Sequence, residues 1–170
     1  MAAEQFDDCD SFPNLVTMFF ARARYRGDAP FLWAKHDATW QSLSWADVAR
    51  QVAGFAKSLR QLGLEKGDRV MLVSENRPEW CIADLGIMAA GCVTVPTYVT
   101  NTERDHQHIL DNSDARAVIV STAKLAKTLT PAALRSSQAE FIIAIEPQPA
   151  MQQGQLSVHL WSDMVKIGRA

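Results

Sequence analysis

The fold of this protein is decided by the stretch DRVMLVSENRPEWCIADLGIMAAGCVTVP, residues 68–96. This stretch predicts a strand over Val70–Val73, a helix over Glu79–Ala90 and a second strand over Val93–Val95. The first strand is a continuous apolar run too short for a helix, which is typical of a strand covered on both faces. The helix follows Pro78 and is apolar on almost every side, so it must lie between other elements.

The alternation of strand and helix continues toward the C-terminus. Further elements are predicted at Glu103–Leu110 (helix), Ala117–Val120 (strand), Lys124–Leu129 (helix) and Phe141–Ile145 (strand). The strands recur every 22 to 25 residues, the spacing of strand–helix units joined by right-handed crossovers. The sequence therefore predicts an α/β fold with a mostly parallel sheet and helices on both faces.

A short helix and a β-hairpin are predicted ahead of the sheet. The helix spans Asn14–Tyr25, and the hairpin joins Phe31–Ala34 to Thr39–Leu43 through a polar Lys-His-Asp turn. Toward the C-terminus, Pro147–Gln155 holds two prolines, four glutamines and a glycine and predicts a loop, after which Val158–Ile167 resumes a strand and a short helix.

An amphipathic helix follows the hairpin. Ser44 and Asp47 resemble a capping box, and Gly63 ends the helix. Apolar residues recur between them at steps of three and four: Trp45, Val48, Val52, Phe55, Leu59 and Leu62. The same steps fit a heptad seam with a partner helix. We favour packing in the protein's own core, because the pattern lasts only about two and a half heptads.

The composition is that of a globular protein. The 170 residues are 48% hydrophobic and 21% charged, and the formal net charge of -2 has no basic run that could follow a phosphate backbone, so we expect no nucleic-acid partner. The three cysteines lack a C-x-x-C spacing, and residues 1–10 lack the basic and apolar regions of a secretory signal. A cytoplasmic location fits best. The uncharged run 85–102 contains glycines and a proline and is not a membrane-spanning helix.

Several familiar site patterns are absent. No G-x-G-x-x-G or G-x-S-x-G motif occurs, and the Gly86–Gly91 pair with Walker spacing is followed by Cys92 instead of lysine. His106 and His108 lie two apart on a predicted helix, so they point away from each other and cannot share a metal. We expect both to be solvated, and we expect no metal site.

Four segments carry a resemblance to a known family. They are GDRV (67–70), SENRPEW (74–80), AGCVTVPTY (90–98) and ILDNSDA (109–115). In this order and spacing they resemble landmarks of the adenylate-forming enzymes, especially the long-chain fatty acyl-CoA synthetases. The resemblance covers about residues 12–146 and implies the N-terminal part of the large domain of those enzymes.

The resemblance implies a ligase that makes an acyl-adenylate from a fatty acid and ATP, with Mg²⁺, and then transfers the acyl group to coenzyme A. The phosphate loop, the metal-binding carboxylate and the mobile lysine of that chemistry lie downstream of the matched region in the family. We therefore expect an N-terminal fragment that is inactive alone and holds no catalytic residue. Its expected organisation is a tail (1–11), the α/β portion (12–146), a linker (147–157) and a truncated continuation of the same domain (158–170).

The resemblance also suggests binding residues. Lys124 and Lys127 occupy the helix that approaches the nucleotide phosphate of coenzyme A in relatives that make acetyl-CoA; a solvated lysine face is the alternative. Tyr98, just past a strand end, is a candidate contact for the acyl chain, and a buried or interface tyrosine is its alternative. Arg77 and Glu75 are interpreted as a charged pair that fixes a loop to the domain.

The resemblance leaves open whether the whole protein binds membranes peripherally or forms a homodimer. A function of a different class also stays open: the complete strand–helix alternation within 170 residues fits a stand-alone, flavodoxin-like ligand-binding or interaction module.

Overall fold

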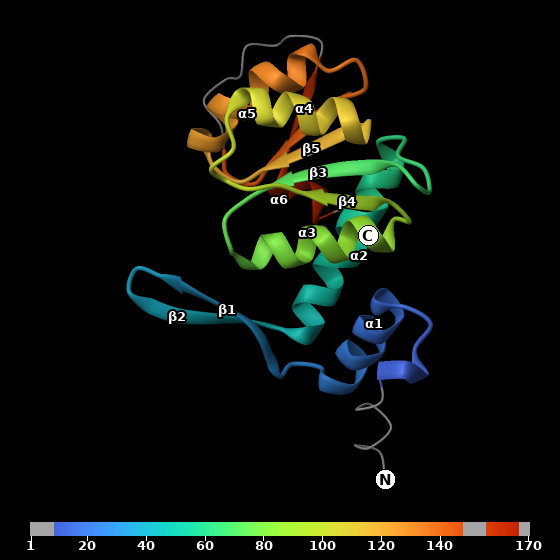
Figure 1. Cartoon of the computed structure of the whole chain (residues 1–170). Helices are drawn as coiled ribbons and strands as arrows, with labels where there is room; N and C mark the ends of the chain where they lie inside the picture. The colour runs from blue at the N-terminus through green and yellow to red at the C-terminus, as the bar shows by residue number, and fades with distance from the viewer. Residues whose placement is uncertain (1–8, 148–155, 167–170) are drawn as a thin grey trace.

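The computed structural model describes residues 9–147 and 156–166 and has a five-stranded, all-parallel sheet at its centre (Figure 1). The strands are β3 (Arg69–Val73), β4 (Val93–Pro96), β5 (Ala117–Val120), β6 (Phe141–Ala144) and β7 (Ser157–Leu160), in the order β4-β3-β5-β6-β7. The order reverses at β3, because the chain first adds β4 on one side and then β5 on the other. The predicted α/β class and parallel sheet are confirmed.

Helices cover both faces of the sheet. α2 (Trp45–Gln61), α3 (Pro78–Ala89) and the short α6 (Trp161–Met164) lie on one face, and α4 (Glu103–Ser113) and α5 (Ala123–Arg135) lie on the other. Alternate residues of β3 divide between the two cores: Val70 and Leu72 face α2 and α3, whereas Met71 and Val73 face α4 and α5. All four are fully buried, which explains why the strand is a continuous apolar run.

The amphipathic helix α2 packs into the protein's own core, as the sequence analysis favoured. Val48, Val52, Phe55 and Leu59 are all fully buried. The Ser44 hydroxyl accepts from the Asp47 amide at 3.0 Å and caps the helix. The predicted N-terminus of α2 is therefore confirmed.

The chain ahead of α2 forms α1 (Leu15–Arg26) and the hairpin of β1 (Pro30–His36) and β2 (Thr39–Ser44), which stands clear of the α/β body in Figure 1. The predicted hairpin is confirmed, but its predicted turn is wrong. The loop consists of Asp37 and Ala38, and Lys35 and His36 lie in β1, paired with Trp40 and Thr39.

The last described elements belong to the same sheet. β7 pairs with β6 in parallel, and the Trp161 ring of α6 lies 4.6 Å from that of Phe55, centroid to centroid. The Ser58 hydroxyl donates to the Met164 carbonyl at 2.6 Å. The predicted linker falls mostly on residues 148–155, which lie outside the described residues. Among the described helices, none has both the length and the apolar character needed to cross a bilayer.

Candidate functional site

The carboxyl ends of the parallel strands meet at one edge of the sheet. In open α/β sheets, ligands bind at this edge, where the strand order reverses. Here the reversal lies at β3, so the loop after β3 (74–77), the loop after β4 (97–101) and the start of α5 after β5 come together. This edge of the sheet is therefore the candidate site.

A cavity of about 550 Å³ opens at this edge. Its lining combines two aromatic side chains with several polar ones: Ser74, Glu75, Asn76, Trp80, Pro96, Thr97, Tyr98 and Val99. Thr97 is held there by its amide, which donates to the Leu72 carbonyl at 3.0 Å. Its Oγ1 is buried and has no hydrogen-bond partner within the described residues.

Tyr98 lies in this cavity and follows β4, as the sequence analysis placed it. Tyr98 is 80% exposed, so it is not a buried core tyrosine, and an interface tyrosine stays as the alternative interpretation. Sequence reasoning missed Trp80, although the residue lines this cavity and a neighbouring one. Its position in the first turn of α3, directly after a strand end, is the signal that could have found it.

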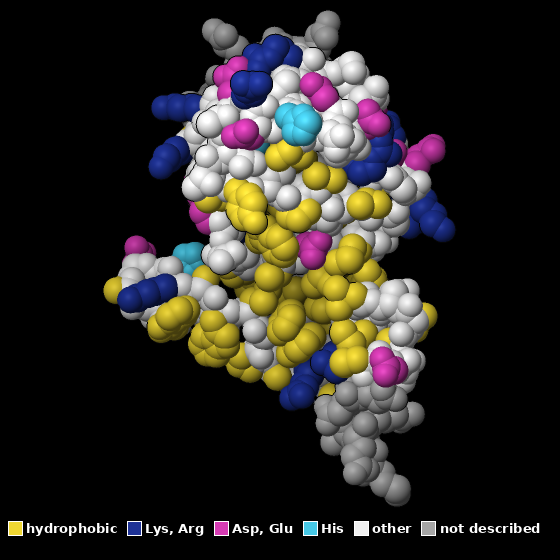
Figure 2. Space-filling model, viewed as in Figure 1, with side chains coloured by type: hydrophobic (Ala, Val, Ile, Leu, Met, Phe, Trp, Pro, Cys, Tyr) yellow, Lys and Arg dark blue, Asp and Glu magenta, His cyan; other side chains and the backbone are white. Residues whose placement is uncertain are grey.

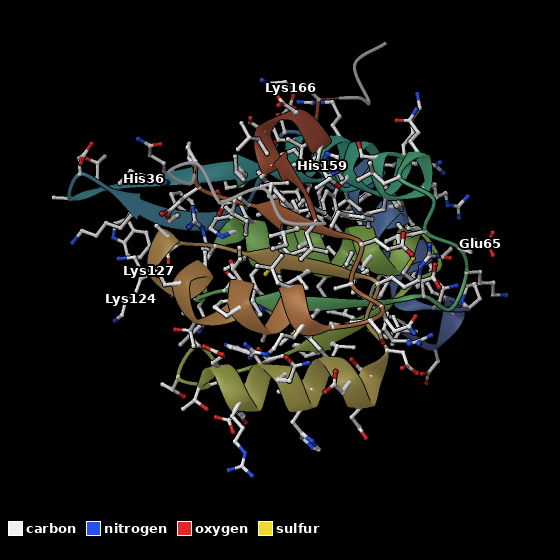
Figure 3. All side chains as sticks on the ribbon, turned by 90° about the horizontal axis from the view of Figure 1, so that it is seen from above. His36, Glu65, Lys124, Lys127, His159 and Lys166 are labelled. Carbon is white, nitrogen blue, oxygen red and sulfur yellow. The ribbon has the colours of Figure 1, made fainter. Side chains whose placement is uncertain are left out.

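Lys124 and Lys127 lie in the first turns of α5 and are both exposed. They are not among the residues that line the cavity. Figure 3 shows both lysines on the same side of the molecule as His36 of the hairpin, whereas Glu65 lies on the opposite side. Two cations one helical turn apart, near a helix N-terminus, form a surface that attracts phosphate.

The loop after β3 is fixed by two ion pairs of Arg77 and by a hydrogen bond to Glu75, and none of these three contacts is an Arg77–Glu75 pair. Arg77 donates from Nε to Glu79 at 2.9 Å and from Nη1 to Glu146 at 2.7 Å. Glu75 instead accepts a hydrogen bond from the hydroxyl of Ser121, which is fully buried at the end of β5. The predicted anchoring of the loop is confirmed, with different partners. These bonds join the ends of β3, β5 and β6.

The structure contradicts the expectation that His106 is solvated. The side chain is 1% exposed, and its Nδ1 has no hydrogen-bond partner within the described residues, so it is not solvated. Burial lowers the pKa of His106, and the nearby Asp105 carboxylate opposes that shift only in part. His108 is exposed, as expected. The described residues contain no group of three or more His, Cys, Asp or Glu side chains that could hold a metal.

Two of the three cysteine thiols, those of Cys81 and Cys92, are not activated nucleophiles. The pKa of Cys81 is raised mainly by burial and also by the negative charge of Asp84. The pKa of Cys92 is raised mainly by burial and also by the negative charge of Asp68. Both shifts favour the neutral thiol, which is the unreactive form.

A doubly wound, all-parallel sheet with an open cavity at its carboxyl edge places the chain in the α/β class of domains. The family follows from sequence: a family model described as AMP-binding enzyme matches residues 19–163, and the chain belongs to that family.

Known relatives agree with this assignment. The long-chain-fatty-acid–CoA ligase FadD15 of Mycobacterium tuberculosis is 35% identical over 109 residues, which are 64% of this chain and 18% of that protein. The human long-chain-fatty-acid–CoA ligase ACSBG2 is 27% identical over 93% of this chain and 24% of its own length. The chain thus spans about a fifth of the length of these relatives.

Solved structures share the fold. The adenylation domain of a carboxylic acid reductase from Segniliparus rugosus, in complex with AMP and a carboxylic acid, aligns with 99% of this chain and 32% of its own, with a TM-score of 0.81 and 13% identity. A benzoate CoA ligase from Burkholderia xenovorans aligns with 87% of this chain and 28% of its own, with a TM-score of 0.67 and 27% identity. These neighbours confirm that the chain has the N-terminal fold of adenylate-forming enzymes.

Proposed function

We propose that this chain is the first α/β layer of an ATP-dependent ligase that activates a long-chain fatty acid as an acyl-adenylate and transfers the acyl group to coenzyme A. The observation that carries the proposal is the family match over residues 19–163. The relatives named as long-chain-fatty-acid–CoA ligases support the substrate class.

Adenylation needs ATP with a magnesium ion and groups that stabilise charge on the transferred phosphoryl. The described residues offer no such metal-binding group, and the sequence has no phosphate-binding glycine motif. We therefore assign no catalytic residue to this chain. Its contribution is the sheet edge: a cavity and a basic helix start beside the reversal of strand order.

The proposal includes two contacts between this edge of the sheet and the substrates. The exposed Lys124 and Lys127 bind the nucleotide phosphate of coenzyme A, because they are the two cations at the start of the helix that follows β5. Tyr98 contacts the acyl chain from the cavity, whose mostly apolar lining also includes Trp80, Pro96 and Val99.

The test is fatty-acid-dependent exchange of pyrophosphate into ATP. The 170-residue chain alone is expected to give none, and the protein encoded by an extended reading frame is expected to show exchange and coenzyme A thioester formation. A reading frame that continues without a Gly/Thr-rich loop ending in Pro-Lys would overturn the proposal. Turnover of ATP and a fatty acid by the 170-residue chain itself would overturn the assignment of no catalytic residue.

One observation favours the second candidate, a stand-alone ligand-binding module. The order β4-β3-β5-β6-β7 is the order 2-1-3-4-5 of flavodoxin-like sheets. A titration with flavin mononucleotide tests it: saturable binding at the sheet edge, weakened by Tyr98→Ala, would favour this candidate over the ligase layer.

A further inference from the structure

A hydrogen bond across the candidate site joins the loop after β3 to the junction between β5 and α5. The hydroxyl of Ser121 donates to the carboxylate of Glu75, which also lines the cavity. Ser121 is fully buried. Its amide donates to the Val73 carbonyl at 3.1 Å, and its carbonyl accepts from the Glu146 amide at 3.0 Å. Every polar group of Ser121 therefore has a partner, and Glu75 supplies the partner of its side chain.

Helix α5 begins just beyond this serine. Its N-cap Thr122 accepts from the Leu125 amide through the hydroxyl, at 3.4 Å, and from the Ala126 amide through the carbonyl, at 3.0 Å. The two lysines proposed to bind phosphate, Lys124 and Lys127, lie in the turns that follow this cap. A shift of the junction would therefore move both ammonium groups.

The Glu75 carboxylate is a strong acceptor for the buried hydroxyl. Hydrogen bonds to an ionised carboxylate are roughly twice as strong as bonds between neutral groups. Removal of the acceptor would leave the Ser121 hydroxyl buried without a partner, which is unfavourable. The junction would then have to rearrange to bring the hydroxyl to another acceptor or to water. Glu75 thus constrains the start of a helix to which it does not belong.

The bond also joins two unlike parts of the surface. Figure 2 shows hydrophobic side chains gathered over α3 and the hairpin, and charged side chains gathered over α4 and α5. The loop that carries Glu75 leads into α3, whereas Ser121 leads into α5. A ligand with an apolar acyl part and a phosphorylated part would meet both sides, so the bond fixes the relative position of the two parts of the site that such a ligand spans.

We propose that Glu75 is a positioning residue: through Ser121 it holds the start of α5 where Lys124 and Lys127 meet the nucleotide phosphate of coenzyme A. This inference rests on the proposed function, which assigns that phosphate to the two lysines. It adds a residue that does not touch the phosphate and yet determines how tightly the phosphate is bound.

The sign of the effect separates positioning from simple charge. A negative carboxylate repels a phosphate, so loss of the Glu75 charge alone would strengthen the binding of coenzyme A. Loss of the hydrogen bond to Ser121 would weaken it, because the lysines would no longer be held in place. Weaker binding after removal of the Glu75 side chain therefore cannot result from the lost charge.

The test is calorimetric titration of the 170-residue chain with coenzyme A and with dephospho-coenzyme A, which lacks the 3′-phosphate. Glu75→Ala is expected to weaken the binding of coenzyme A about two- to fivefold, the range expected for one exposed lysine, and to leave the binding of dephospho-coenzyme A unchanged. Glu75→Gln removes the charge but keeps an acceptor, so it is expected to bind coenzyme A at least as tightly as the unchanged chain. Glu65→Ala, which removes an exposed carboxylate on the opposite side of the molecule (Figure 3), is the matched control.

Ser121→Ala tests the bond from its other end. It is expected to weaken the binding of coenzyme A as much as Glu75→Ala does, and the double variant is expected to bind no more weakly than either single variant. Amide hydrogen exchange measures the start of α5 without a ligand. The amides of Leu125 and Ala126 should exchange faster in Glu75→Ala and in Ser121→Ala, and at the unchanged rate in Glu75→Gln.

The positioning role is overturned if exchange at the start of α5 stays the same in Glu75→Ala, or if this variant binds coenzyme A as well as the unchanged chain while Lys124→Ala binds it more weakly. Equal losses for coenzyme A and dephospho-coenzyme A in Glu75→Ala also overturn it. If exchange changes as expected but neither lysine variant loses affinity for coenzyme A, the positioning of α5 stands and the phosphate contact of the proposed function is wrong.

Discussion

Gly86 on α3 lies directly against the ring of Phe55 on α2: a Cβ added to Gly86 would lie 2.6 Å from the Cδ1 atom of that ring. Real side chains do not approach so closely. The Phe55 ring is fully buried and is also in contact with Trp161. It therefore has little room to move away, and the close approach of α2 and α3 depends on the missing side chain.

Gly86→Ala is expected to destabilise the protein by about 1–3 kcal/mol, because it overpacks this contact. An exposed helix position would instead gain about 1 kcal/mol from the same substitution. Urea unfolding measures the difference. Phe55→Leu in the Gly86→Ala background should recover part of the loss. Strictly additive effects of the two substitutions would show that the residues do not meet.

The turn of the β1–β2 hairpin has a backbone conformation that favours glycine. Asp37 and Ala38 both have positive φ, at 46° and 64°, in a two-residue turn that normally takes Asn-Gly or Asp-Gly. Ala38→Gly relieves the steric cost of the left-handed conformation and is expected to stabilise the hairpin by about 0.5–1 kcal/mol. Amide hydrogen exchange in β1 and β2 should slow. Ala34→Gly, within β1, is the control and should speed it. Unchanged or faster exchange in Ala38→Gly would contradict the turn geometry.

Buried His106 makes stability depend on pH. Burial lowers its pKa in the folded state below the usual 6.5, so the folded protein binds fewer protons than the unfolded chain near pH 6. Stability is therefore greatest above pH 6.5 and decreases as the pH falls through that value toward the folded-state pKa. His106→Leu removes the titrating group and the unpartnered Nδ1 atom.

We expect His106→Leu to raise the free energy of unfolding by about 1 kcal/mol at pH 7.5 and by more at pH 5.5. Urea unfolding at the two pH values measures both quantities. His108→Leu, which changes an exposed histidine on the same helix, should leave the pH dependence as it is. If the free energy of unfolding of His106→Leu changes with pH as much as that of the unchanged protein, His106 is not the group responsible for the pH dependence.

Much of the fold could be predicted because the relevant signals are local. The buried run Val70–Val73, the proline that opens α3 and Gly91 with φ of 83° each act within a few residues. Helix α5 shows the limit of local signals. The sequence predicted its end at Leu129, before Pro131, yet the helix continues to Arg135. Ala132 and Ala133 are fully buried, and that packing outweighs the local effect of the proline.

The site was less predictable, since it depends on side chains that only the topology brings together. The bond between Glu75 and Ser121 joins residues 46 positions apart, and nothing in either segment indicates it. The burial of His106 likewise depends on how α4 packs against α5. Tyr98 was placed at this edge because its position relative to β4 is a local signal. Trp80, in the first turn of α3, carries a similar local signal, but its meeting with the loop after β4 in one cavity depends on the topology.

The proposed phosphate site on α5 gives the last prediction. Coenzyme A carries a 3′-phosphate that dephospho-coenzyme A lacks, so the two ligands isolate the contribution of Lys124 and Lys127. On this exposed helix each lysine is expected to contribute about two- to fivefold in affinity, and salt should reduce the effect. Calorimetric titration should therefore show weaker binding of coenzyme A to Lys124→Ala and to Lys127→Ala, and unchanged binding of dephospho-coenzyme A. Lys66 is an exposed lysine next to Glu65, which lies on the opposite side of the molecule (Figure 3), and Lys66→Ala should match the unchanged chain with both ligands. If neither variant loses affinity for coenzyme A, the solvated lysine face is the correct interpretation. Equal losses of affinity for the two ligands would show that the lysines contact a part of coenzyme A other than that phosphate.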